Sequence, residues 1–204
     1  MKKGITKILS ACVFAFVVFL AAGTQSKAAV NMGVKQTGAG SSYVDLAWDA
    51  QLGAGHYHTQ FSQDGKNWID MDNSSSPSES VYNLTQGASY YARVVAYKGS
   101  HYTGTHVMIG VSETAIVSTK PTEVSGLTQT AAGVNSVSMS WNASAGAASY
   151  VIYGYINYNW TQIGTSATNS ATITGVAATT STRFSVAAVK NVTGGTVTGD
   201  QCSG

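Results

Sequence analysis

One stretch of the chain occurs twice, first as VKQTGAGSSYVDLAWDAQLGAGHY (residues 34–57) and again as LTQTAAGVNSVSMSWNASAGAASY (residues 127–150). Many residues are identical at this offset of 93 positions. They include Gln36, Thr37, Gly40, Trp48, Ala50, Gly53, Ala54 and Tyr57. A period of this length is too long for a solenoid repeat and fits a whole small domain. The repeat predicts two homologous domains, and Pro121 favours an extended junction between them at residues 118–122.

Each copy has the pattern of short β-strands. Apolar and polar residues alternate in residues 43–48, 90–97 and 136–141, which is typical of half-buried antiparallel strands. An Asp-Gly pair at residues 64–65 indicates a hairpin turn. About seven such strands in a domain of ~90 residues predict a β-sandwich. The core positions expected from the alternation are Val44, Leu46, Trp48, Val137, Met139 and Trp141.

Several motifs in these strands match one family. The second expected strand ends in Trp48 or Trp141, and the third opens with Tyr57 or Tyr150. Residues 61–68 match a hairpin common in bacterial members, and Leu84 is followed six residues later by Tyr90. Over roughly residues 31–204 the chain resembles tandem fibronectin type III domains, secreted and of bacterial type.

The resemblance implies an all-β fold of two tandem seven-stranded immunoglobulin-like sandwiches. An N-terminal signal peptide is expected to precede them. We expect a signal peptide at 1–28, a first domain at 29–119 and a second at 120–204, whose last strand is short or incomplete. The resemblance also places Tyr90 in the family's tyrosine corner. Thr182 stands at the matching position of the second domain and lacks the phenol, so we expect that domain to be less stable.

The first residues look like a targeting segment. Lys2, Lys3 and Lys7 precede an uncharged apolar run at residues 8–23, and cleavage is expected after Ala28. An uncleaved membrane anchor is the alternative, although a spanning helix requires ~20 apolar residues. We expect the mature protein to be secreted, extracellular or on the cell surface, with no membrane segment after cleavage.

The composition excludes some functions. Only 10% of the residues are charged, and removal of four lysines with the signal segment leaves 7 basic and 9 acidic residues. This balance argues against nucleic-acid binding, which requires clustered Lys and Arg. Cys202 is the only cysteine outside the signal segment, so an intramolecular disulfide is not expected.

The sequence carries no catalytic or phosphate-binding motif, and we expect neither an enzyme nor a cofactor. The family topology brings the loops of His56, His101 and His106 to one end of the first domain. Three histidines could bind zinc, but nothing in the sequence fixes their geometry, and we expect no metal site there.

Outward aromatic residues are the better lead to a binding site. Tyr150 and Ile152 should face the core of the second domain, which turns Tyr153 and Tyr155 outward. Tyr158 and Trp160 follow in the adjacent hairpin. Exposed rings suit stacking on sugar faces or packing on a partner. The alternative is that aromatic residues simply favour strands, or that the domains cover these faces themselves. In the first domain Tyr91, Val95 and Tyr97 should also point outward around Arg93.

We therefore expect a non-enzymatic extracellular binding, adhesion or spacer module, carbohydrate-associated and monomeric. Its expected ligand-binding residues are Tyr153, Tyr155, Tyr158 and Trp160, and its expected partner is an extracellular polysaccharide or a surface protein. The alternative is an accessory fragment of a secreted polysaccharide-degrading enzyme whose catalytic domain lies outside this chain.

Overall fold

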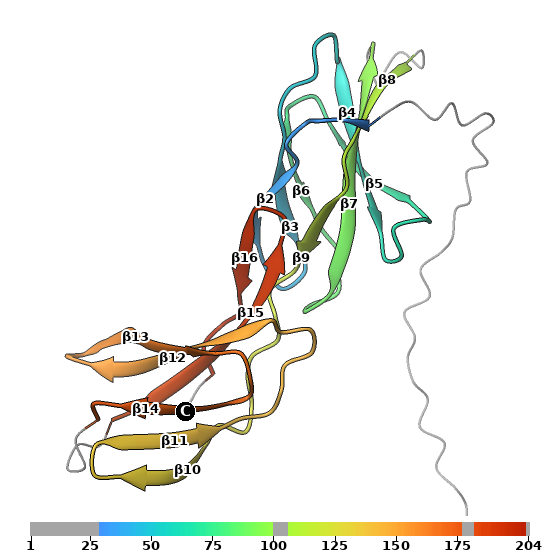
Figure 1. Ribbon diagram of the computed structural model, residues 1–204. Helices are drawn as coiled ribbons and strands as arrows, with labels where there is room; N and C mark the ends of the chain where they lie inside the picture. The colour runs from blue at the N-terminus through green and yellow to red at the C-terminus, as the bar shows by residue number, and fades with distance from the viewer. Residues whose placement is uncertain (1–28, 100–105, 177–181, 203–204) are drawn as a thin grey trace, which may run out of the picture.

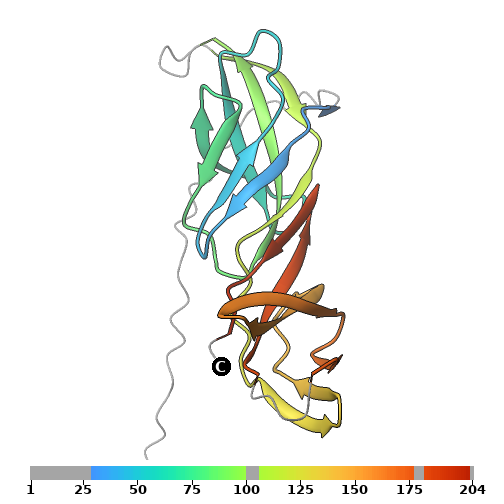
Figure 2. The same ribbon diagram turned by 90° about the vertical axis from the view of Figure 1, so that its left-hand side faces the viewer.

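A computed structural model describes residues 29–99, 106–176 and 182–202 (Figure 1). The described part consists of strands, turns and loops, and it forms two β-sandwiches, one above the other (Figure 2). The expected all-β, immunoglobulin-like fold is confirmed. The expected signal segment at 1–28 lies outside the described residues.

The first domain pairs a three-stranded sheet with a six-stranded sheet. The smaller sheet contains β2 (Lys35–Ala39), β3 (Val44–Ala47) and β6 (Ser78–Val81), in that order. The larger sheet runs β1 (Ala29–Val30), β8 (Val107–Ser112), β7 (Ser89–Lys98), β4 (His56–Ser62) and β5 (Ile69–Ser74). The last strand, β9 (Ala115–Ser118), pairs with β7.

The second domain repeats this plan with a three-stranded and a four-stranded sheet. The first contains β10 (Thr128–Gly133), β11 (Ser136–Ser140) and β14 (Ser170–Thr174). The second runs β13 (Asn159–Ser166), β12 (Ser149–Ile156), β15 (Phe184–Val192) and β16 (Gly195–Thr198). Beyond β16 the chain stays beside β15, where the Gly199 and Cys202 N–H groups donate to the carbonyls of Ala188 and Val186.

The predicted core positions are confirmed, with one difference. Val44, Leu46, Trp48, Met139 and Trp141 are all at most 5% exposed. Val137 packs against the same core but is only half-buried. One of the two cross-strand neighbours of Val137 is the small, exposed Ala132, which leaves one side of the Val137 side chain uncovered.

The repeated sequence encodes a repeated piece of geometry. In the first domain Trp48 meets Tyr57 edge-on at 5.4 Å, and the Tyr57 hydroxyl accepts the Gln51 N–H at 3.0 Å. In the second, Trp141 meets Tyr150 at 5.3 Å, and the Tyr150 hydroxyl accepts the Ser144 N–H at 3.0 Å. The loop between each pair contains a glycine with positive φ, Gly53 at 83° and Gly146 at 68°. These contacts explain why Trp, Gly and Tyr recur at the same spacing.

One stabilising contact is present in the first domain alone. The hydroxyl of the buried Tyr90 accepts the Thr85 N–H at 3.0 Å, as expected for a tyrosine corner. This bond fixes the turn before β7 to the core. Thr182, at the matching position before β15, has no ring with which to make it.

The β15–β16 hairpin of the second domain lies against the first domain (Figure 1). At its turn, the Thr193 N–H donates to the Ile116 carbonyl at 2.8 Å, and the Ile116 N–H donates to Thr193 Oγ1 at 2.7 Å. The ammonium of Lys190 donates to the Gly87 carbonyl, and Lys120 pairs with Asp200 at 2.7 Å. A hollow of about 380 Å³ remains between β2 and β16.

Candidate functional site

The hairpin of β12 and β13 carries the four aromatic residues expected to bind a ligand. We call Tyr153, Tyr155, Tyr158 and Trp160 the aromatic hairpin. Tyr155 and Trp160 face each other across the two strands, with ring centroids 5.2 Å apart and planes inclined by 60°. Tyr155 is 38% exposed and Trp160 is 42% exposed. The two rings therefore form an angled pair that is open to solvent on its outer side.

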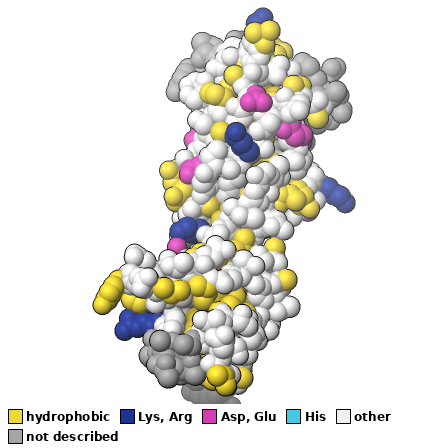
Figure 3. Space-filling model, turned by 60° about the vertical axis from the view of Figure 1, so that its left-hand side comes forward, with side chains coloured by type: hydrophobic (Ala, Val, Ile, Leu, Met, Phe, Trp, Pro, Cys, Tyr) yellow, Lys and Arg dark blue, Asp and Glu magenta, His cyan; other side chains and the backbone are white. Residues whose placement is uncertain are grey.

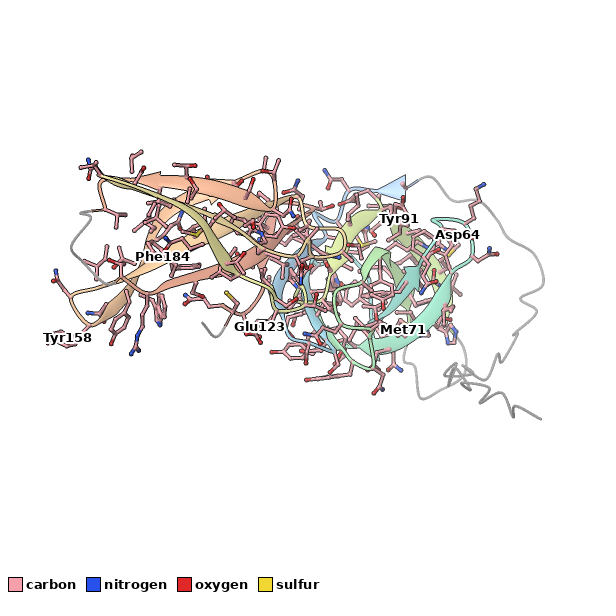
Figure 4. All side chains as sticks on the ribbon, turned by 90° about the horizontal axis from the view of Figure 1, so that it is seen from below. Asp64, Met71, Tyr91, Glu123, Tyr158 and Phe184 are labelled. Carbon is pink, nitrogen blue, oxygen red and sulfur yellow. The ribbon has the colours of Figure 1, made fainter. Side chains whose placement is uncertain are left out.

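The turn of the hairpin holds Tyr158 in an unfavourable backbone conformation. Asn157 and Tyr158 both have positive φ, 49° and 65°, as the type I′ turn of a two-residue hairpin loop requires. Asn tolerates this region, but a bulky L-residue there costs roughly 1–2 kcal/mol. Tyr158 is nonetheless 90% exposed and points away from the first domain at the far end of the molecule (Figure 4). Backbone strain that no packing explains is a pointer to function.

Tyr153 lies apart from the other three residues. It sits further along β12, with Gln162 and Ser185 as cross-strand neighbours, and it is half-buried. The pairing of β12 with β13 shifts by one residue between Ile152 and Tyr153. The structure thus brings Tyr155, Tyr158 and Trp160 together at the tip and leaves Tyr153 on the flank.

Two further residues belong to this surface and were not singled out from the sequence. Ile156, beside the turn, is 43% exposed. Arg183 is exposed, and its carbonyl accepts the Tyr155 N–H at 2.9 Å. The hairpin turn could have indicated Ile156, but the position of Arg183 depends on the pairing of β12 with β15, which the local sequence does not reveal. Hydrophobic side chains form a band across the second domain in the space-filling view (Figure 3).

The histidines of the first domain gather around Tyr97. His56 opens β4 and is buried, its ring stacked on that of Tyr97 at 5.2 Å, and its Nδ1 lies 2.9 Å from the Gly99 carbonyl. His106 meets both rings edge-on, at 5.3 Å from His56 and 4.9 Å from Tyr97. His58 joins the cluster, although the sequence analysis had not grouped it there. His101 lies outside the described residues.

The described residues offer neither a metal-binding cluster nor an exposed thiol. No group of three or more His, Cys, Asp or Glu side chains in the described ranges is arranged to hold a metal ion. Cys202 is buried in the core, and its sulfur accepts the Val186 N–H at 3.1 Å, so the thiol is inaccessible. Residues 29–99, 106–176 and 182–202 also contain no helix long and apolar enough to cross a membrane.

One expected outward residue of the first domain is buried. Tyr91 is 39% exposed, as predicted, and Tyr97 is half-buried. Val95 is only 2% exposed, so the prediction that it points into solvent is wrong. Its side chain lies between those of His58 and Val111 in the strand register, and the histidine cluster builds a second layer over the sheet at this point.

The sheet order decides the type of sandwich. In each domain a three-stranded sheet faces a larger sheet. In the larger sheet of the first domain β4, β7 and β8 are neighbours, and in that of the second domain β12, β15 and β16 are neighbours. This is the sheet arrangement of the family, and the first domain also has the tyrosine corner. Both domains have the fibronectin type III fold. The tandem arrangement predicted from the sequence repeat is confirmed.

Among solved structures, tandem fibronectin type III segments are similar to this chain. A two-domain segment of chicken tenascin is 18% identical with a TM-score of 0.41, and the match covers 84% of this chain and 95% of that chain. The FN1–FN3 domains of chicken CNTN1 are 14% identical with a TM-score of 0.44, covering 86% of this chain and 65% of theirs. The central fibronectin type III array of RIM-binding protein is 15% identical with a TM-score of 0.31, covering 76% of this chain and 56% of its own. No family model and no curated protein matches the sequence.

Proposed function

We propose that this protein is a secreted, non-enzymatic module that attaches to extracellular polysaccharide through the aromatic hairpin. The N-terminal segment at 1–28 supports secretion by its basic start and apolar run. The two sandwiches, at 29–119 and 120–204, act as a short rod that carries the hairpin at one end.

The observation that carries the proposal is the conformation of Tyr158. A glycine at this position of a type I′ turn would avoid the cost of positive φ, yet the chain has a tyrosine whose side chain is 90% exposed. The ring contributes little to packing within the protein. The presence of a tyrosine at this position is therefore best explained by a contact of its ring with another molecule.

The surrounding surface fits an uncharged ligand. Asn157, Asn159 and Gln162 supply amide groups on the hairpin, which itself carries no charged side chain, and Arg183 lies beside it. Aromatic rings stack on the apolar faces of sugars without requiring charge. Because Tyr155 and Trp160 touch each other and are inclined by 60°, they form an angled surface that suits a single sugar chain lying across both rings better than a flat crystalline surface.

Retention on insoluble polysaccharides tests this proposal. The mature protein is incubated with a panel of neutral and acidic polymers, beside a Tyr155→Ala, Trp160→Ala double variant. Tyr82→Ala is the matched control, because Tyr82 is a 55% exposed tyrosine in the other domain. We expect the double variant to lose retention on at least one polymer while Tyr82→Ala keeps it, with all proteins folded by circular dichroism. Equal retention of the double variant and the wild type on every polymer that binds would refute the site, and no retention of the wild type on any polymer would refute the polysaccharide as partner.

A further inference from the structure

The outer face of the larger sheet in the first domain carries an ordered row of polar side chains. Asp70 on β5, Gln60 on β4 and Arg93 on β7 are direct neighbours across the three strands. The Arg93 Nε–H donates to Gln60 Oε1 at 2.7 Å, and Gln60 Nε2–H donates to Asp70 Oδ1 at 2.7 Å. Each side chain in the row is thus held by the next.

An aromatic ring also holds the Arg93 guanidinium in place. The central carbon of the Arg93 guanidinium lies 4.1 Å from the centroid of the Trp68 ring, a cation–π contact. Trp68 follows a turn that is itself fixed, because Asp64 Oδ1 accepts the N–H groups of Lys66 and Asn67, both at 2.8 Å. The N–H groups of Asn67 and Lys66 hold the pKa of Asp64 well below its usual range, so this turn is preserved at any physiological pH.

The terminal nitrogens of Arg93 remain available. They make no hydrogen bond or ion pair to any residue that the structure describes, while the guanidinium is half-buried and held in place. A guanidinium presents its paired N–H groups in a planar fork that binds two neighbouring oxygen atoms. Tyr91, two residues earlier on the same face, adds a 39% exposed ring beside the Asp64 turn (Figure 4).

The charges around Arg93 indicate which kind of ligand oxygen atoms its guanidinium would bind. Burial and the nearby Asp70 raise the pKa of the Tyr97 hydroxyl, and Arg93 lowers it, which places all three groups within electrostatic reach of one another. Asp70 offsets the charge of Arg93, and residues 29–119 contain 4 basic and 7 acidic residues. A polyanion would be repelled by this domain. Neighbouring hydroxyl groups of an uncharged sugar suit a site with one donor fork, one carboxylate and one flanking ring.

We infer that Arg93, Gln60, Asp70, Trp68 and Tyr91 form a second saccharide subsite, in the first domain, for a neutral sugar with adjacent hydroxyl groups. It rests on the proposed function only in taking the same class of polymer, and it shares no residue with the aromatic hairpin. Two separate subsites on one chain would raise retention on a polymer by multivalency.

Affinity electrophoresis in gels that contain a soluble polysaccharide tests the inference on the whole mature protein. The probes are a neutral β-glucan, a neutral galactomannan and polygalacturonate, each at low and high salt. The variants are Arg93→Met and Arg93→Lys, and the control is Lys35→Met, which removes the same charge at an exposed position of the other sheet of the same domain. Thermal unfolding of each variant confirms that the domain is folded.

We expect Arg93→Met and Arg93→Lys to weaken binding to a neutral polymer about tenfold, and Lys35→Met to leave it unchanged. The loss should add to that of the Tyr155→Ala, Trp160→Ala double variant. If Arg93 variants bind every polymer as the wild type does, the subsite is refuted even where the hairpin is confirmed. Binding to polygalacturonate alone, abolished by salt, would overturn the assignment to neutral sugars. A loss with Arg93→Met but none with the hairpin variant would support this subsite and refute the hairpin.

Discussion

Replacing Tyr158 by glycine should stabilise the second domain and weaken its binding at the same time. The φ of 65° at this residue costs a bulky L-residue roughly 1–2 kcal/mol, and glycine avoids that cost. Glycine loses about 0.5–1 kcal/mol more backbone entropy on folding, which offsets part of the gain. Because the side chain is 90% exposed, little packing is lost. From the middle of the two ranges, the net gain is about 0.75 kcal/mol.

This gain is measurable in a domain of this size. A change of 1 kcal/mol shifts the midpoint of thermal unfolding by roughly 4–8 °C in a domain of 60–100 residues. We therefore expect Tyr158→Gly to raise the midpoint of the second domain by about 3–6 °C in differential scanning calorimetry. Retention on polysaccharide should fall in the same variant, since the ring at the tip is gone.

Asn157→Gly is the matched control for this experiment. Asn157 has a φ of 49° in the same turn but tolerates that conformation, so its replacement should change stability by less and leave retention intact. A lower unfolding midpoint for Tyr158→Gly would mean that the ring packs against the domain. An unchanged retention would show that the tip takes no part in binding.

Three further predictions concern the framework. Tyr57→Phe and Tyr150→Phe each leave a half-buried backbone N–H without its acceptor. Each variant should destabilise its own domain by about 1 kcal/mol, which urea unfolding would show as a separate shift of that domain's transition. An equal effect of either variant on both domains would contradict this. Burial opposes ionisation of Glu113, but hydrogen bonds from backbone N–H groups outweigh this effect and lower its pKa. Glu113→Gln should therefore destabilise the first domain above pH 4.5, and the difference from the wild type should shrink as the pH falls below that value. A difference that stays constant with pH would count against these hydrogen bonds. Burial lowers the pKa of Lys190 from 10.5, so Lys190→Met should raise the free energy of unfolding at pH 7. This gain should shrink as the pH rises towards 10.5. A lower free energy of unfolding at pH 7 would show that the hydrogen bond from Lys190 to the Gly87 carbonyl outweighs the cost of burial.

Much of the fold follows from the sequence because the repeat carries its own geometry. Trp48 and Tyr57 pack in the same way as Trp141 and Tyr150, so the recurrence of these residue types indicates the same core in both domains. The alternation that begins at Tyr150 likewise gives the outward side of β12. Patterns of this kind are local, and they predict which side of a strand is buried.

The remainder depends on pairing between distant strands. Val95 alternates as an outward residue, but it is buried because His58 on β4 lies beside it. The contacts of Arg93 join β7 to Gln60 on β4 and to Trp68 just before β5, and the pairing of β12 with β13 shifts in register beside Tyr153. Such contacts follow from register, which short-range patterns do not specify.

If the aromatic hairpin contacts a sugar chain, the indole N–H of Trp160 lies at that contact, and its NMR signal should change on binding. In ¹⁵N-labelled mature protein, the indole signals of the buried Trp48 and Trp141 serve as internal references for that of Trp160. The titrant is a soluble oligosaccharide of the polymer that retains the protein. We expect saturable shifts of the Trp160 indole and of the amides of residues 153–160, with the two buried indoles unmoved. A bound oligosaccharide that leaves the Trp160 signal unchanged would contradict binding at the aromatic hairpin.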